Sequence, residues 1–124
     1  MENIKIATAQ FENKSGDKTY NLNVIESLSK QAASQGAQVA AFHECSITGY
    51  TFARHLTKEQ MLDLAEFIPD GPSIKRLTEI AKNLNIAILA GLFEKDAEDK
   101  IYKAYVCVDK NGLVAKYRKL HPFI

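Results

Sequence analysis

The chain has 124 residues, of which 46% are hydrophobic and 25% are charged, and its net charge is +1. This composition is typical of a single soluble domain and gives no indication of a nucleic-acid partner or a membrane span. Two cysteines, Cys45 and Cys107, are too few for a disulfide framework, so we expect a cytoplasmic protein. The cysteines and the three histidines have none of the spacings that are typical of a metal site.

The first half of the chain contains two strand-like patterns on either side of a helical one. Residues 3–11 alternate between apolar and polar side chains, and residues 38–42 form a short apolar run, so both are predicted to be strands. Residues 20–37 have apolar side chains at helical spacing and predict an amphipathic helix. Residues 46–58 predict a loop, and residues 58–67 predict a short helix.

The second half begins with a break at residues 69–72, whose sequence is Pro-Asp-Gly-Pro. The apolar stripe over residues 74–84 predicts a second amphipathic helix. Residues 86–93 are apolar on both faces, which is typical of a strand that is covered by layers on both sides. Residues 94–99 are predicted to form a charged turn.

The last two predicted strands, residues 101–108 and 113–119, are joined by a turn at residues 109–112. The Asn-Gly pair in this turn supplies the positive φ angles of a tight hairpin, so the two strands should be antiparallel. The order of all the elements predicts an α/β fold with a parallel-rich sheet and an antiparallel edge.

Glu44 is the first candidate for a catalytic group because it follows the predicted strand 38–42. Functional sites of open α/β sheets form at the carboxyl ends of the strands. A carboxylate in that place would be partly desolvated, which raises its pKa toward the range of a useful general base. The alternative is a strand-end acid that pairs with a nearby lysine.

Cys45 is adjacent to this acid but is a poor candidate for its partner. Neighbouring side chains of an extended chain point to opposite faces, so Glu44 should not take a proton from Cys45. We expect Cys45, and Cys107 in the middle of its strand, to be buried packing residues. His43 is also expected to pack rather than react.

The basic stretch "KYRKLH" at residues 116–121 is the second candidate. It could be a solvated basic strand or a small anion-binding patch, but a lysine directed into a cleft could instead stabilise an oxyanion. Alternation along a strand separates the six side chains into two groups. One group is Lys116, Arg118 and Leu120, and the other is Tyr117, Lys119 and His121.

Four stretches together resemble the amino-terminal half of the nitrilase, or carbon–nitrogen hydrolase, superfamily, and they cover nearly the whole chain. The segment "VAAFHECSITGY" resembles the one that carries the catalytic glutamate, which maps to Glu44. The segment "GLVAKYRKLHPF" resembles the one that carries the catalytic lysine, which maps to Lys119. The other two stretches are "IKIATAQF" and "IPDGPSIKRLTEIAKNLNIAILAGLFE".

The resemblance implies part of a four-layer αββα sandwich, with a mixed sheet and helices packed on one face. Residues 1–124 would be the amino-terminal portion of a single domain whose remainder is missing. The implied catalytic triad is Glu44, Lys119 and a cysteine that forms a thioester. In the family that cysteine lies well beyond the lysine segment, so this chain alone is expected to be inactive. No metal or organic cofactor is implied.

The implied substrate is a small linear amide, carbamoyl compound or nitrile, and the implied assembly is a homodimer. Tyr50, Tyr117 and His121 are expected to line the substrate pocket. Two residues depart from the family pattern: His43 stands where many members have proline, and Lys103 where many have asparagine. The alternative function is a non-catalytic α/β module that binds a small molecule or has a regulatory role.

Overall fold

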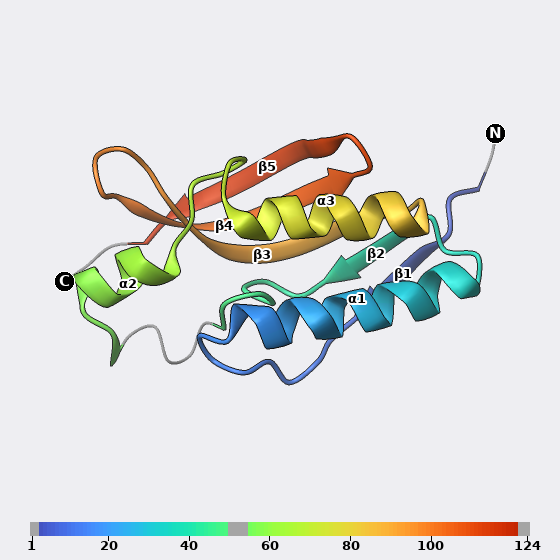
Figure 1. Cartoon of the computed structure of the whole chain (residues 1–124), viewed down its shortest axis with the longest axis horizontal. Helices are drawn as coiled ribbons and strands as arrows, with labels where there is room; N and C mark the ends of the chain where they lie inside the picture. The colour runs from blue at the N-terminus through green and yellow to red at the C-terminus, as the bar shows by residue number, and fades with distance from the viewer. Residues whose placement is uncertain (1–2, 50–54, 122–124) are drawn as a thin grey trace.

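The computed structural model describes residues 3–49 and 55–121, which form one mixed sheet of five strands in the order β1–β2–β3–β4–β5 (Figure 1). The first two pairs of neighbours are parallel and the last two are antiparallel. The predicted α/β fold with a mixed sheet is therefore confirmed, although its antiparallel part comprises both β4 and β5. The strands are β1 Ile6–Ala9, β2 Val39–Phe42, β3 Ala87–Lys95, β4 Ile101–Asp109 and β5 Gly112–Leu120.

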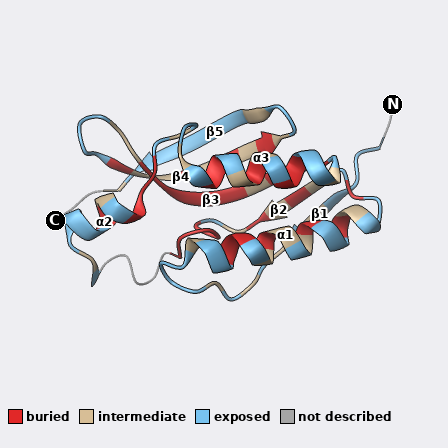
Figure 2. Ribbon diagram, in the orientation of Figure 1, coloured by how far each residue is buried: buried red, intermediate tan, exposed pale blue. Residues whose placement is uncertain are grey.

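Two long helices pack on the same face of the sheet (Figures 1 and 2). These are α1, Lys18–Ser34, and α3, Pro72–Leu84, and the short helix α2, Lys58–Leu64, lies near one end of the sheet. The side chain of Asp17 caps α1, and Thr57 forms a capping box with Gln60 in α2. None of the described helices is long and apolar enough to cross a membrane.

The main hydrophobic core lies between the sheet and these two helices (Figure 2). The central strand β3 is buried on both faces over residues 90–94, whereas the edge strands β1 and β5 have no fully buried residue. On β4 the buried side chains alternate, and Val106 and Val108 belong to the core. Cys107 lies between them and is only half-buried on the face opposite α1 and α3, which we call the open face. The prediction that Cys107 belongs to the core is therefore wrong, because alternation gives the core positions to its neighbours.

One edge of β3 is bonded by three successive segments of the chain. Parallel β2 pairs with its first residues and ends at Phe42. The next segment is a turn, in which the backbone N–H of Ile47 donates to the carbonyl of Gly91 at 2.9 Å. Farther along, the N–H of Glu66 donates to the carbonyl of Phe93 at 3.0 Å. The chain therefore leaves the sheet after β2 and forms a turn, while its later residues still hydrogen-bond to the same edge of β3.

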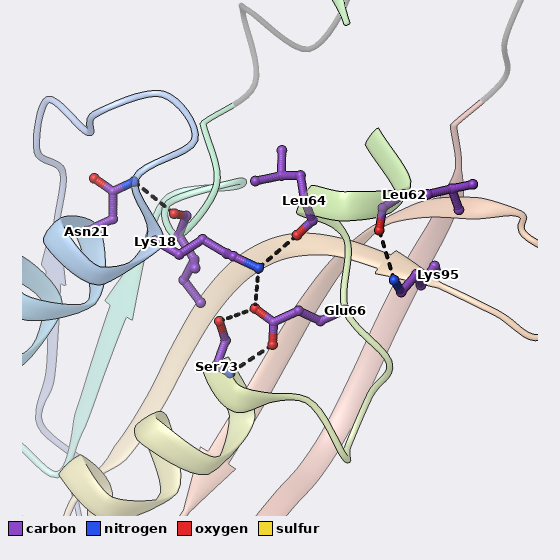
Figure 3. A network of polar contacts seen from close by, with 8 residues as sticks. Lys18, Asn21, Leu62, Leu64, Glu66, Ser73 and Lys95 are labelled. Carbon is purple, nitrogen blue, oxygen red and sulfur yellow. Dashed lines mark hydrogen bonds and ion pairs between the residues drawn. The ribbon is translucent and has the colours of Figure 1, made fainter. Parts of the chain in front are cut away.

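A buried polar network holds Glu66 in that position (Figure 3). Its side chain is 4% exposed, and its carboxylate accepts hydrogen bonds from Lys18 Nζ at 3.0 Å and from the backbone N–H of Ser73 at 2.8 Å. The hydroxyl of Ser73 also donates to it. Lys18 Nζ donates in addition to the carbonyl of Leu64 at 2.9 Å. The network thus joins the start of α1, the end of α2 and the start of α3, and it satisfies a buried charge.

Candidate active site

Glu44 and Cys45 lie in a turn that follows β2, and the backbone of Cys45 has a positive φ of 54°. The expectation that these two residues continue an extended chain is therefore wrong. Two asparagines that precede β2 in the chain hold this turn in place by hydrogen bonds to its carbonyl groups. Asn13 Nδ2 donates to the carbonyl of Cys45 at 3.0 Å, and Asn21 Nδ2 donates to the carbonyl of Ile47 at 2.8 Å. Asn21 is completely buried at the start of α1, so a core residue positions the turn that carries Glu44.

Gly91 of β3 lies directly behind this turn. A Cβ atom at position 91 would overlap the backbone nitrogen of Cys45 and would lie 3.1 Å from the carbonyl carbon of Glu44. The N–H of Gly91 donates to the hydroxyl of Ser46 at 3.2 Å. Only a residue without a side chain lets β3 and the turn approach so closely.

Strand β5 brings Lys119 to the same region from the other end of the chain. It pairs with β4 so that Lys119 lies opposite Lys103, and Tyr117 lies opposite Tyr105. Side chains two residues apart on a strand share a face, so these four residues form one block on the open face. The predicted alternation of the basic stretch is confirmed here for Tyr117 and Lys119.

The opposite face of β5 is anchored by Glu94, whose side chain is 5% exposed. Its carboxylate lies 2.6 Å from Lys116 Nζ and 3.7 Å from Arg118 Nη1. Glu94 is the penultimate residue of β3, so the predicted charged turn over residues 94–99 begins too early. The strand continues because Glu94 and Lys95 still pair with Tyr102 and Ile101 of β4. The carboxylate of Glu94 reaches across β4 to its two cationic partners on β5. These contacts hold β5 from one side while Lys119 extends on the other.

A cavity of about 140 Å³ on the open face brings the two candidate residues together. Glu44 and Lys119 both line it, but they form no direct ion pair within the part of the chain that is described. The space between them is therefore available to a small molecule. The complete lining consists of Glu44, Cys45, Lys103, Ala104, Tyr105, Tyr117 and Lys119.

Glu44 itself is exposed, which differs from the partly desolvated carboxylate that the sequence predicts. Lys119 is exposed as well. The reason is that the cavity opens on the sheet face that α1 and α3 do not cover. The carboxylate and the ammonium group are therefore placed near each other in an open-sided cavity of this chain.

Tyr105 is a lining residue that sequence reasoning missed. Its hydroxyl donates to the carbonyl of Phe42, at the end of β2, and so ties β4 to the strand that leads to Glu44. Burial raises the pKa of the Tyr105 hydroxyl, and the negative charge of Glu44 raises it further. The signal was present in the alternation of residues 103, 105 and 107 on the strand before the basic stretch.

Cys45 is confirmed as a buried packing residue although it contributes to the cavity wall. It is 3% exposed and belongs to a small hydrophobic cluster that includes Met61 and Phe93. Burial raises the pKa of the Cys45 thiol to about 11, with Lys103 opposing this shift and Glu44 adding to it. At neutral pH the sulfur is therefore a thiol and a poor nucleophile.

The remaining predicted pocket residues have different positions. His121 packs edge-on against Phe93 with ring centroids 5.6 Å apart, and it is not among the residues that line the cavity. Burial lowers the pKa of His121, and Lys103 lowers it further. Tyr50 lies outside the described residues.

His43 packs against Phe11 with ring centroids 5.1 Å apart, as expected. Within residues 3–49 and 55–121, no three His, Cys, Asp or Glu side chains are grouped in a way that suits a metal ion.

The chain belongs to the carbon-nitrogen hydrolase family, whose model matches residues 5–123. It is 35% identical over 120 residues to a nitrilase of Pyrococcus abyssi and 32% identical over 124 residues to the omega-amidase NIT2 of Homo sapiens. The structure of Saccharomyces cerevisiae Nit3, a member of branch 10 of the nitrilase superfamily, superimposes with a TM-score of 0.78 at 25% identity.

These matches include nearly all of this chain but less than half of each relative. The alignments cover 97% of the chain and 44% of the Pyrococcus nitrilase, and 99% of the chain and 42% of the human omega-amidase. The superposition covers 95% of the chain and 44% of Nit3. The chain therefore corresponds to a part of the length of these proteins.

Proposed function

We propose that the full-length protein hydrolyses a carbon–nitrogen bond, other than a peptide bond, in a small linear amide, carbamoyl compound or nitrile. Glu44 is the general base and Lys119 stabilises the tetrahedral intermediate. The observation that carries this proposal is that a carboxylate from the turn after β2 and an ammonium group from β5 line one cavity. The names of the relatives, a nitrilase and an omega-amidase, support the same class of reaction.

For an amide substrate, the first half of the reaction forms a thioester. Glu44 takes the proton from the thiol of a cysteine that this chain does not supply, and the sulfur attacks the carbonyl carbon. The carbonyl oxygen becomes an oxyanion, which the ammonium group of Lys119 stabilises. The C–N bond then breaks, and the proton held by Glu44 passes to the leaving nitrogen. Ammonia or an amine leaves, and the acyl group remains on the sulfur.

The second half of the reaction restores the enzyme. Glu44, again ionised, takes a proton from a water molecule, and the oxygen of that water attacks the thioester carbon. Lys119 stabilises the second tetrahedral intermediate. The C–S bond breaks, the proton returns to the sulfur, and the carboxylic acid leaves. One carboxylate thus acts as a base in both halves, which requires it to lie beside the reacting atoms without being locked in an ion pair.

We also propose that the protein is cytoplasmic and forms a homodimer. Both cysteines are free thiols, which suits a reducing compartment. The open face exposes apolar side chains at both of its edges, where Ile6 is 58% exposed and Tyr117 is 67% exposed. Surface of this kind is normally covered by another part of the protein or by a partner.

Ammonia release by the full-length protein from short aliphatic amides tests the proposed function, with Lys119→Ala as the variant. We expect Lys119→Ala to lower kcat by about 10² to 10³-fold, because an electrostatic partner of the oxyanion is lost. Lys110→Ala is the matched control, since Lys110 is exposed in the hairpin turn far from the cavity lining. This variant should keep the activity of the wild type.

Two outcomes would count against the proposal. One is that the wild-type protein releases neither ammonia nor acid from any amide or nitrile in the panel. The other is that Lys119→Ala and Lys110→Ala have equal activity, in which case Lys119 has no part in the reaction.

A further inference from the structure

The turn that carries Glu44 leaves the edge of β3 for several residues. The register of β2 against β3 runs only as far as Ala41. The backbone is hydrogen-bonded to β3 again at Ile47, whose N–H donates to the carbonyl of Gly91 at 2.9 Å. Glu44 lies between these two points. The position of its carboxylate therefore depends on contacts other than the ladder of the sheet.

Tyr105 of β4 supplies one such contact at the start of this stretch. It lies opposite Gly91 in the register of β4 against β3, and Gly91 lies directly behind the turn. The Tyr105 hydroxyl donates to the carbonyl of Phe42, the last residue of β2. Because β3 lies between β4 and β2, the side chain must cross β3, and the absence of a side chain at Gly91 leaves room for it. One hydrogen bond thus joins β4 to the residue at which the chain leaves β2.

Packing alone does not hold the chain at this point, because two cavities border it. The cavity of about 140 Å³ is lined by Glu44 and Cys45. A second cavity of about 310 Å³ is lined by Phe42 and His43, and Tyr105 lines both cavities. The chain passes from one cavity to the other between His43 and Glu44, so there is space into which it could shift. The hydrogen bond from Tyr105 opposes such a shift.

We propose that Tyr105 is a positioning residue, which holds the carbonyl of Phe42 and thereby sets the place of the Glu44 carboxylate relative to the reacting atoms. This inference rests on the proposed function, because it concerns the same general base. A displacement of about 1 Å is enough to lower a rate about 10²-fold when it misplaces a reacting group. Tyr105 itself transfers no proton, because its hydroxyl proton is donated to Phe42 and the raised pKa of the phenol keeps it there.

Tyr105→Phe in the full-length protein tests this role, since it removes the hydroxyl and keeps the ring. With butyramide as the amide, we expect kcat to fall about 10- to 100-fold and KM to change little, because the base is displaced while the cavity keeps its shape. Tyr102→Phe is the matched control, because it makes the same change at a phenol whose hydroxyl donates to Asp96 at 3.0 Å, just after β3. It should lose similar stability in urea and keep the kcat of the wild type.

A double-mutant cycle with Glu44→Gln shows whether Tyr105 acts through Glu44. If it does, Tyr105→Phe should change the residual kcat of the Glu44→Gln protein by less than about 2-fold, since the base is already absent. An equal fall in both backgrounds would mean that Tyr105 acts independently of Glu44, which overturns the inference. The same conclusion follows if Tyr105→Phe and Tyr102→Phe have equal kcat.

Failure of the proposed function is recognised separately. If the wild type releases no ammonia from butyramide or from any other amide in the panel, the proposed function fails, and hydrogen–deuterium exchange then decides whether Tyr105 holds the turn. We expect the backbone amides of residues 43–46 to exchange at least about 3-fold faster in Tyr105→Phe than in the wild type, but not in Tyr102→Phe, because a hydrogen bond to the start of the turn is lost. Equal exchange in the two variants overturns the inference.

Discussion

Replacing Glu44 by glutamine in the full-length protein is expected to lower kcat for amide hydrolysis by at least about 10³-fold, because a general base contributes 10² to 10⁴-fold and this one acts in both halves of the reaction. Glutamine keeps the size of the side chain and cannot accept a proton. Glu44 is exposed in its turn, so the substitution should leave the fold intact. Stopped-time ammonia assays and far-UV circular dichroism check the two parts of this prediction.

Glu98→Gln provides the matched control. It makes the same chemical change at a carboxylate that is 76% exposed in the turn between β3 and β4. We expect this variant to retain wild-type kcat and KM. A Glu44→Gln protein that stays within about 3-fold of the wild type would exclude Glu44 as the base, since even the weakest general bases contribute more than that.

Gly91→Ala should strongly destabilise the protein. The added methyl group would overlap the backbone nitrogen of Cys45, and backbone atoms cannot move aside as a flexible side chain can. We expect a loss of about 3 kcal/mol or more in the free energy of unfolding, at the upper end of overpacking effects. The turn that carries Glu44 must shift, so the full-length protein should also lose most of its activity. Urea denaturation and ammonia release measure the two effects.

Gly36→Ala separates this steric effect from the conformational cost of replacing a glycine. Gly36 has a φ of 87°, but nothing lies within 4 Å of the Cβ that alanine would add. The left-handed backbone should cost about 1–2 kcal/mol, and kcat should not change. If Gly91→Ala is no less stable than Gly36→Ala and remains active, then β3 does not position the catalytic turn.

Much of the fold could be predicted because its signals are local. Periodicity located α1, α3 and all five strands, and the Asn-Gly pair located the turn between β4 and β5. Alternation along β5 correctly placed Tyr117 and Lys119 on one face and Lys116 and Arg118 on the other, where Glu94 pairs with them. The resemblance to a family then indicated Glu44 and Lys119 as the residues to examine.

The geometry of the site depends on contacts between distant segments, which local patterns do not reveal. Nothing in the sequence around Glu44 shows that Gly91 lies behind it or that Asn21 fixes its turn. The register between β4 and β5, which brings Lys103 into the cavity, is likewise a property of the pairing. The sequence wrongly predicted a partly desolvated Glu44, because the desolvation of a carboxylate depends on what covers it. Glu44 borders the open face of the sheet, whereas α1 and α3 cover the opposite face.

We propose that Glu44 and Lys119 act with a cysteine other than Cys45, which is next to Glu44. Iodoacetamide inactivation of the full-length protein at pH 8, followed by peptide mass mapping, tests it most directly. Because the pKa of the Cys45 thiol is about 11, roughly one in a thousand molecules carries the thiolate at this pH, and labelling there should be slow. We expect activity to be lost as a single cysteine outside residues 1–124 is alkylated. Loss of activity that follows the alkylation of Cys45 or Cys107 would contradict it.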